Sequence, residues 1–140
     1  MTDTDLIAKK LAYIETCVRE LRSIARPKEI PTDIVQRRFV EHTLQISIQA
    51  ALDTAAHIVS DERLGEPSTN RDLFGILVKN GWLPQNLASP LRAMVGFRNV
   101  LVHEYQVVDL AVVEDVVTNH LDDLLAFVQA VRERLARAGS

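Results

Sequence analysis

The sequence predicts an all-α protein, a single domain of residues 1–140 folded as an up-and-down bundle of about five helices. Apolar residues recur along most of the chain at the three- and four-residue spacing of an amphipathic helix. Glycine and proline number only five each, too few for an all-β domain that turns every ~8–12 residues. A chain of 140 residues can bury roughly 68–70% of its unfolded surface, so a hydrophobic core is sufficient to hold it together.

Two long helices are predicted in the first half of the chain. The first covers about residues 3–25 and ends before Pro27 and Pro31, because proline disfavours helix in the residue that precedes it. The second covers about residues 32–60. At 1.5 Å per residue it is ~40 Å long, so it is expected to be the central element of the bundle.

Three further helices are predicted in the second half. A short one begins after Thr69 and Asp72, which have the spacing of a capping box. The next covers about residues 90–105, with Ser89 as its N-cap and a proline at its first position. Asp109 caps a last long helix, whose Arg-rich final turn suits the helix dipole.

Charge and hydropathy exclude several classes of protein. Sixteen Lys and Arg against 19 Asp and Glu give a net charge of −3, which argues against a broad basic surface that coats nucleic acid. No stretch approaches the ~18 consecutive apolar residues of a membrane helix. The acidic N-terminus is unlike a secretory signal, and the single cysteine, Cys17, suits a reducing compartment. We therefore expect a cytoplasmic protein without a membrane partner.

The sequence contains no pattern of a metal or cofactor site. It has no glycine-rich phosphate loop, no paired cysteines, no H-E-x-x-H and no serine elbow. None of His42, His57, His103 and His120 has another His or Cys three or four residues away, and His42 and His57 would be about 22 Å apart on one helix. We expect neither a metal nor a cofactor.

The exception to this lack of chemistry is the segment from Gly96 to Gln106. On a helical projection with about 100° per residue, Arg98, Asn99, His103 and Tyr105 fall within one arc, from about −20° to 140°. Residues Asn99 and His103 are four apart, so their side chains are expected to touch. The opposite, apolar side of the projection consists of Met94, Phe97, Val100 and Leu101. The polar arc is therefore expected to point away from the bundle core.

These residue types match the requirements of RNA phosphodiester cleavage. A histidine with a pKa near neutrality can move the proton of a 2′-hydroxyl or of a leaving group. A guanidinium can stabilise the negative charge that builds on phosphorus, and its planar fork can hold two phosphate oxygens. From the residue types alone a solvated or interfacial polar face is the simpler interpretation, and Glu104 is most simply a solvated charge.

The string Arg98-Asn99, three residues, His103, one residue, Tyr105 resembles the R-x4-H-x-Y motif of the HepT-like toxins, a branch of the all-helical HEPN superfamily. The resemblance extends over most of residues 30–130. It includes the preceding M-x-G-F, the segment A-L-D-T-A-x-H-I-V in the second helix, and D-L-F-x-x-L followed by G-W-L-P.

The resemblance implies a homodimer in which two copies of the motif helix form one composite cleft. It also implies a metal-independent ribonuclease that is neutralised by a minimal nucleotidyltransferase (MNT) antitoxin, which transfers AMP from ATP to the tyrosine of the motif. Arg98 would then bind the scissile phosphate, His103 would act as acid or base, Asn99 would orient His103 or the phosphate, and Tyr105 would be modified.

Other interpretations remain open at this stage. Tyr105 can instead pack across a dimer interface with its hydroxyl paired. The whole chain can be a non-catalytic docking or substrate-binding subunit of a nucleotidyltransferase, which the acidic composition favours, because a ribonuclease benefits from positive potential at its cleft. A small-ligand-binding bundle is the third possibility, although it would have to use the same polar cluster.

Overall fold

The computed structural model describes residues 2–103 and 107–138, and within these ranges it contains helices and no strand. The α-helices are α1 (Thr4–Ile24), α2 (Ile34–Asp61), α3 (Asp72–Lys79), α4 (Ala88–Val102), α5 (Leu110–Asn119) and α6 (Leu121–Ala138), and the 3₁₀ helices are Pro27–Glu29 and Gln85–Leu87. The predicted all-α bundle is confirmed.

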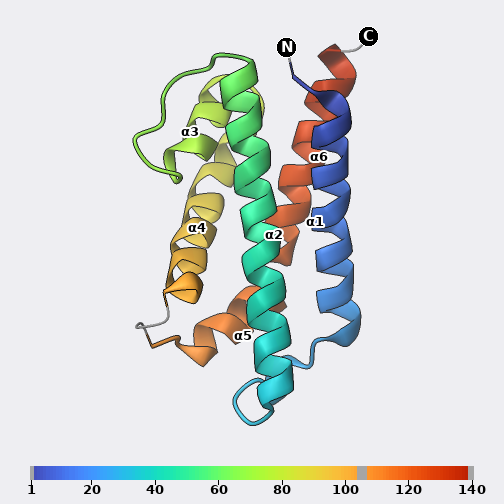
Figure 1. The fold of residues 1–140 in the computed structure, drawn as a ribbon, viewed down its shortest axis with the longest axis vertical. Coiled ribbons are helices and arrows are strands. Elements are labelled where there is room, and N and C mark those ends of the chain that lie inside the picture. Colours follow the sequence, from blue (N-terminus) through green and yellow to red (C-terminus); the bar gives the residue numbers. More distant parts are fainter. Residues whose placement is uncertain (1, 104–106, 139–140) are drawn as a thin grey trace.

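The long helix α2 lies at the centre of the bundle (Figure 1). Helices α1 and α6 cover one side of it, α3 and α4 cover the other, and α5 crosses near one end. Every α-helix contributes fully buried apolar side chains to one continuous core, for example Leu11, Leu44, Leu77, Val95, Val113 and Phe127. None of the described helices is long and apolar enough to cross a membrane.

Aspartate side chains begin three of the helices. Asp3, Asp33 and Asp109 each accept hydrogen bonds from backbone N–H groups in the first turn of α1, α2 and α5, which compensates donors that have no partner inside the helix. Only half of the capping box predicted for α3 is present. The N–H of Thr69 donates to the Asp72 carboxylate over 3.2 Å, but the N-cap residue is Arg71 and no side chain caps the helix.

Both predicted boundaries of the fourth helix are wrong. Helix α4 begins at Ala88 rather than 90, and no side chain caps it. The cause is that the 3₁₀ helix Gln85–Leu87 leads directly into it, so that the N–H of Ala88 bonds to a carbonyl of that turn and Ser89 is not needed as a cap. At the other end α4 stops at Val102, and His103 has an extended backbone with φ −94° and ψ 102°.

The predicted last long helix is two helices, α5 and α6, which meet at His120. The break lets α5 cross beneath the bundle before α6 returns along α1 (Figure 1). The His120 ring lies between two carboxylates, with Nε2 3.1 Å from Asp115 and Nδ1 3.5 Å from Asp123. A hydrogen bond from Asn119 lowers the pKa of Asp115, so this carboxylate stays ionised beside the ring.

Candidate active site at the end of helix α4

The candidate site lies on the last turns of α4, where the helix packs against α2. In the first half of α4 the side chains of Leu91, Met94 and Val95 are buried, whereas every residue from 96 to 102 is only half-buried. Arg98 is part of this half-buried stretch and its side chain contacts α2. The expectation that the polar arc points away from the bundle is therefore wrong for Arg98.

Two side-chain amides bind the terminal nitrogens of Arg98. Nη1 donates to Oδ1 of Asn99 over 3.0 Å, and Nη2 donates to Oε1 of Gln49 on α2. Nε is buried and has no hydrogen-bond partner within the described part of the chain. Arginine has more N–H donors than these two contacts use, so donors remain for an anionic ligand.

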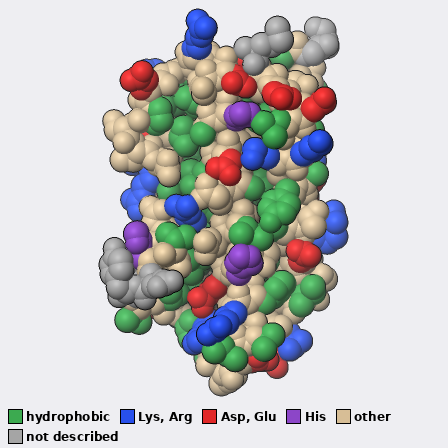
Figure 2. Space-filling model, in the orientation of Figure 1, with side chains coloured by type: hydrophobic (Ala, Val, Ile, Leu, Met, Phe, Trp, Pro, Cys, Tyr) green, Lys and Arg blue, Asp and Glu red, His purple; other side chains and the backbone are tan. Residues whose placement is uncertain are grey.

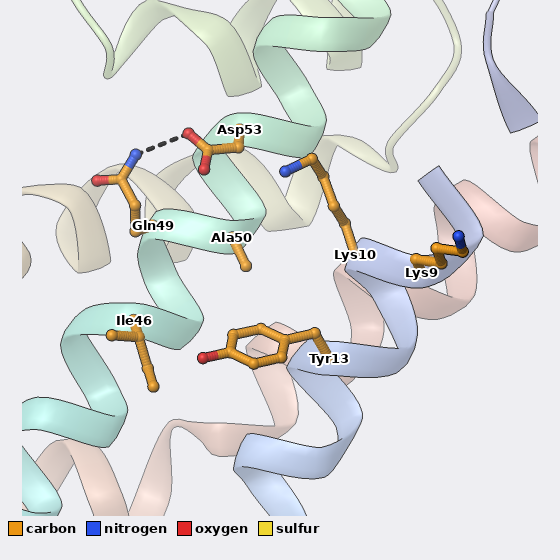
Figure 3. Close-up of a pocket in the computed structure, with 7 residues that line it drawn as sticks. All are labelled: Lys9, Lys10, Tyr13, Ile46, Gln49, Ala50 and Asp53. Carbon is orange, nitrogen blue, oxygen red and sulfur yellow. Dashed lines mark hydrogen bonds between the residues drawn. The ribbon is translucent and has the colours of Figure 1, made fainter. Parts of the chain in front are cut away.

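Both acceptors of Arg98 are neutral amides. They orient the guanidinium through hydrogen bonds but add no negative charge that would offset its own. The Gln49 amide is itself bound, because its Nε2 donates to Oδ1 of Asp53, one turn further along α2, over 2.7 Å (Figure 3). The described contacts thus hold a cation at the rim of the core and leave it able to attract a phosphate.

His103 is the fifth residue after Arg98 and lies just beyond the end of the helix. Its side chain is exposed, and its backbone N–H bonds to the carbonyl of Val100 over 3.3 Å. Since His103 is not helical, the helical projection that paired it with Asn99 does not apply. Asn99 instead directs its carbonyl oxygen to Arg98.

Tyr105, the predicted site of modification, and Glu104 lie outside the described residues. The structure therefore places two of the four motif residues together, Arg98 and Asn99, and puts His103 at the exposed end of the same helix.

The face of the molecule drawn in Figure 2 has no continuous basic patch among the described residues. Figure 2 shows Lys and Arg side chains scattered among acidic and apolar ones over one face of the molecule. In the ranges 2–103 and 107–138, no three His, Cys, Asp or Glu side chains are grouped so that they could hold a metal ion.

Gln49 is the residue that the sequence analysis missed. A signal was present, because Gln49 and Asp53 are polar residues four apart on a helix whose neighbouring positions are mostly apolar. The residue that Gln49 contacts, Arg98, is 49 residues away in the sequence, so local spacing does not connect the two.

Residues 14–131 match a protein-family model described as "Ribonuclease HepT-like". This chain belongs to the HepT-like ribonuclease family. The HepT-like chain is 33% identical over 129 residues to the mRNA nuclease HepT of Shewanella oneidensis, which covers 91% of this chain and 97% of that protein. It is also 39% identical over 74 residues to the tRNA nuclease HepT of Aphanizomenon flos-aquae, covering 53% of this chain and 50% of the relative.

A solved structure supports the same relationship. The HepT-like chain resembles a tri-AMPylated HEPN toxin of Shewanella oneidensis in complex with MNT antitoxin, with a TM-score of 0.85 and 33% identity over 95% of this chain and 99% of that one. The predicted relationship to the HepT toxins is confirmed, and the comparisons favour a ribonuclease over a non-catalytic docking subunit.

Proposed function

We propose that the protein is the endoribonuclease toxin of a HepT/MNT toxin–antitoxin pair, with Arg98 and His103 as catalytic residues and Asn99 orienting Arg98. One observation carries this proposal. Arg98 is held by two neutral amides at the half-buried end of α4, and an exposed histidine follows it where the helix ends.

The proposed reaction needs no metal. The 2′-oxygen of a ribose attacks the adjacent phosphorus, and the bond from that phosphorus to the 5′-oxygen of the next nucleotide breaks. A base takes the proton of the 2′-hydroxyl and an acid protonates the leaving oxygen, and histidine can do either near neutral pH. The products are a 2′,3′-cyclic phosphate and a 5′-hydroxyl end.

Arg98 binds the phosphate that reacts. During the attack, negative charge builds on the non-bridging oxygens, and a positioned cation stabilises that charge more than it stabilises the substrate. The amide contacts from Gln49 and Asn99 hold the guanidinium in place before the RNA arrives. Less reorganisation is then needed during the reaction.

We further propose that two copies form the complete site. In a symmetric dimer, the ends of the two α4 helices face each other, and each His103 supplies one of the two proton transfers. The position of Val107, which is 95% exposed a few residues beyond the end of α4, supports this arrangement, because an apolar side chain on the surface suits an interface.

The proposed partner is a minimal nucleotidyltransferase antitoxin that transfers AMP from ATP to Tyr105. The tyrosine hydroxyl gives up its proton to solvent, its oxygen forms a bond to the α-phosphorus of ATP, and the bond from that phosphorus to pyrophosphate breaks. The added nucleotide carries a negative phosphate on a residue seven positions after Arg98 in the sequence, and we propose that it blocks RNA by its size and by its charge. The tri-AMPylated HEPN toxin among the similar solved structures supports this regulation.

We propose a cytoplasmic location. Both ATP and RNA are cytoplasmic, and the free thiol of Cys17 suits that compartment.

The test is cleavage of a mixed RNA substrate in excess EDTA by purified wild type, His103→Ala and His42→Ala. His42 is another exposed histidine, on α2 and outside the motif, so its substitution is the matched control. We expect wild type and His42→Ala to cleave equally and His103→Ala to be inactive, with all three equally helical by circular dichroism.

Intact mass is recorded on the same samples, and the ends of the products are mapped. Cyclic phosphate ends would support the proposed chemistry. If unmodified wild type does not cleave, or if His103→Ala cleaves like wild type, the catalytic proposal is wrong. The interpretation as a non-catalytic docking subunit is then favoured. A chain that carries AMP is assayed again after it has been produced without the antitoxin.

A further inference from the structure

We propose that Gln49 and Asp53 are positioning residues of the active site, which fix the Arg98 guanidinium without cancelling its charge. This inference rests on the proposed role of Arg98 as the group that binds the scissile phosphate. It assigns two residues of α2, which lie outside the R-x4-H-x-Y motif, to the same reaction.

The first support is a continuous chain of hydrogen bonds between two helices. Arg98 donates through Nη2 to Gln49, and Gln49 donates through Nε2 to Asp53 over 2.7 Å. In Figure 3 the Gln49 and Asp53 side chains lie on the same side of α2, with the amide nitrogen turned to the carboxylate. This part of α2 borders a groove whose other wall is α1, with Tyr13 and Lys10.

The second support is that only one orientation of the Gln49 amide satisfies both neighbours. A guanidinium can only donate and an ionised carboxylate can only accept. The amide therefore has to present its nitrogen to Asp53 and its oxygen to Arg98, as observed. Asp53 thus prevents the amide from turning its N–H groups toward the arginine.

The third support is the chemistry of the acceptor. A glutamate at position 49 could bind the guanidinium as well as glutamine does, but its charge would offset that of Arg98. It would also face Asp53 four residues away on the same helix, where like charges repel. Glutamine is the side chain of this length that orients the arginine and leaves its charge available to RNA.

The experiment compares Gln49→Glu, Gln49→Met and Asp53→Asn with the control Gln129→Glu. Gln129 donates to Glu133 on α6 over 2.9 Å with the same four-residue spacing, so this control repeats the change of charge away from Arg98. We expect kcat for RNA cleavage to fall about a hundredfold in Gln49→Glu. We expect about a tenfold fall in Gln49→Met, because its side chain has no comparable acceptor for Arg98, and a smaller fall in Asp53→Asn. The control should stay within about twofold of wild type.

A second readout is independent of cleavage. Rotation of the Arg98 guanidinium is followed by NMR in ¹³C,¹⁵N-labelled protein, with the signal assigned through Arg98→Lys. We expect slow rotation in wild type and Gln129→Glu, and faster rotation in Gln49→Met. A purely structural role for Gln49 would alter thermal stability but would not rank Gln49→Glu below Gln49→Met in kcat at equal helicity.

The outcomes separate this inference from the proposed function. If wild type cleaves RNA and the Gln49 variants match Gln129→Glu, the positioning role is wrong while the ribonuclease stands. Equal losses in Gln49→Glu and Gln49→Met would overturn the argument from charge. If wild type does not cleave, the proposed function fails, and unchanged guanidinium rotation in Gln49→Met would overturn the positioning role as well.

Discussion

The two halves of α4 are built in different ways. In the first half, Leu91, Met94 and Val95 are 1%, 4% and 0% exposed and belong to the common core. In the second half, residues 96–102 are half-buried, and Arg98 is held to α2 by a side-chain amide. The first half anchors the helix by apolar burial, and the second half holds the candidate site residues Arg98 and Asn99 at the rim of the core.

The difference shows why the rim suits an arginine with the proposed role of binding phosphate. Complete burial would remove water from the guanidinium at a large cost in free energy. Full exposure would leave it mobile and screened by solvent. At the half-buried end of α4, neighbouring amides replace part of the lost hydration, and the charge stays accessible. We therefore expect substitutions in the first half to affect stability and those in the second half to affect activity.

The largest expected effect is the loss of stability in Leu91→Ala. Leu91 is 1% exposed, so the truncation leaves a cavity in the core. We expect the free energy of unfolding to fall by about 2–5 kcal/mol. Urea unfolding followed by circular dichroism measures it. A loss below about 1 kcal/mol would show that the first half of α4 does not anchor the helix in the way described.

Arg98→Ala should give the complementary result. RNA cleavage is expected to fall about 10²–10³-fold, which corresponds to the loss of one group that stabilises charge in the transition state. The free energy of unfolding should change by less than about 1 kcal/mol, since Arg98 is only half-buried and contacts neutral partners. Arg98→Lys keeps the charge without the planar fork and should recover part of the activity. If urea unfolding shows that Arg98→Ala loses much more than about 1 kcal/mol of the free energy of unfolding, the division between the two halves is wrong.

Gly96→Ala tests the boundary between the halves. The Arg71 guanidinium lies over Gly96 where a Cβ would be, and it can move because it is the end of a flexible side chain. Alanine is favoured over glycine within a helix by roughly 0.5–1 kcal/mol. We expect thermal unfolding to show a gain of this size and cleavage to stay unchanged. A less stable variant would mean that Arg71 is held firmly against α4.

The smallest effect is expected at an ion pair remote from both halves of α4. Arg132 on α6 donates to both carboxylate oxygens of Glu15 on α1, over 2.7 and 2.6 Å, and this hydrogen bonding lowers the pKa of Glu15. Because the pair is partly exposed, Glu15→Gln should reduce the free energy of unfolding by only ~0.2–1 kcal/mol at pH 7.

The dependence of this effect on pH follows from the direction of the pKa shift. A lowered pKa in the folded protein means that the pair contributes fully above ~4.3, the usual glutamate pKa, and that the contribution disappears as the pH falls further. Unfolding curves of wild type and Glu15→Gln should therefore converge in acid. A difference that persists at pH 2 would assign the effect to packing rather than to charge.

Much of this molecule follows from local sequence. The spacing of apolar residues predicted the long helices, and Asp109 was correctly predicted as a helix cap, because both signals depend on residues within one or two turns. The string from Arg98 to Tyr105, together with the matching segments in residues 30–130, indicated the HepT-like family. The family is readable in this way because its motif residues lie close together in the chain.

The errors arose where local pattern and tertiary packing disagree. Helical periodicity continues past Val102, but burial on α4 fades after Val95, and a helix in a small domain is stabilised mainly by the face that it buries. Periodicity likewise continues through His120, where the chain has to turn so that α6 can pack along α1. Neither ending has a strong signal such as proline.

The sequence by itself determined the all-α class, the two long helices of the first half, the family and the identity of the motif residues. Only the tertiary structure decided the surroundings of Arg98, because its partner Gln49 comes from another helix, 49 residues earlier. A helical repeat specifies which side of a helix is apolar, but the neighbour of a half-buried polar side chain depends on how α2 and α4 pack together. That packing depends on the whole core, so it made an apparently ordinary glutamine of α2 a direct contact of the candidate active site.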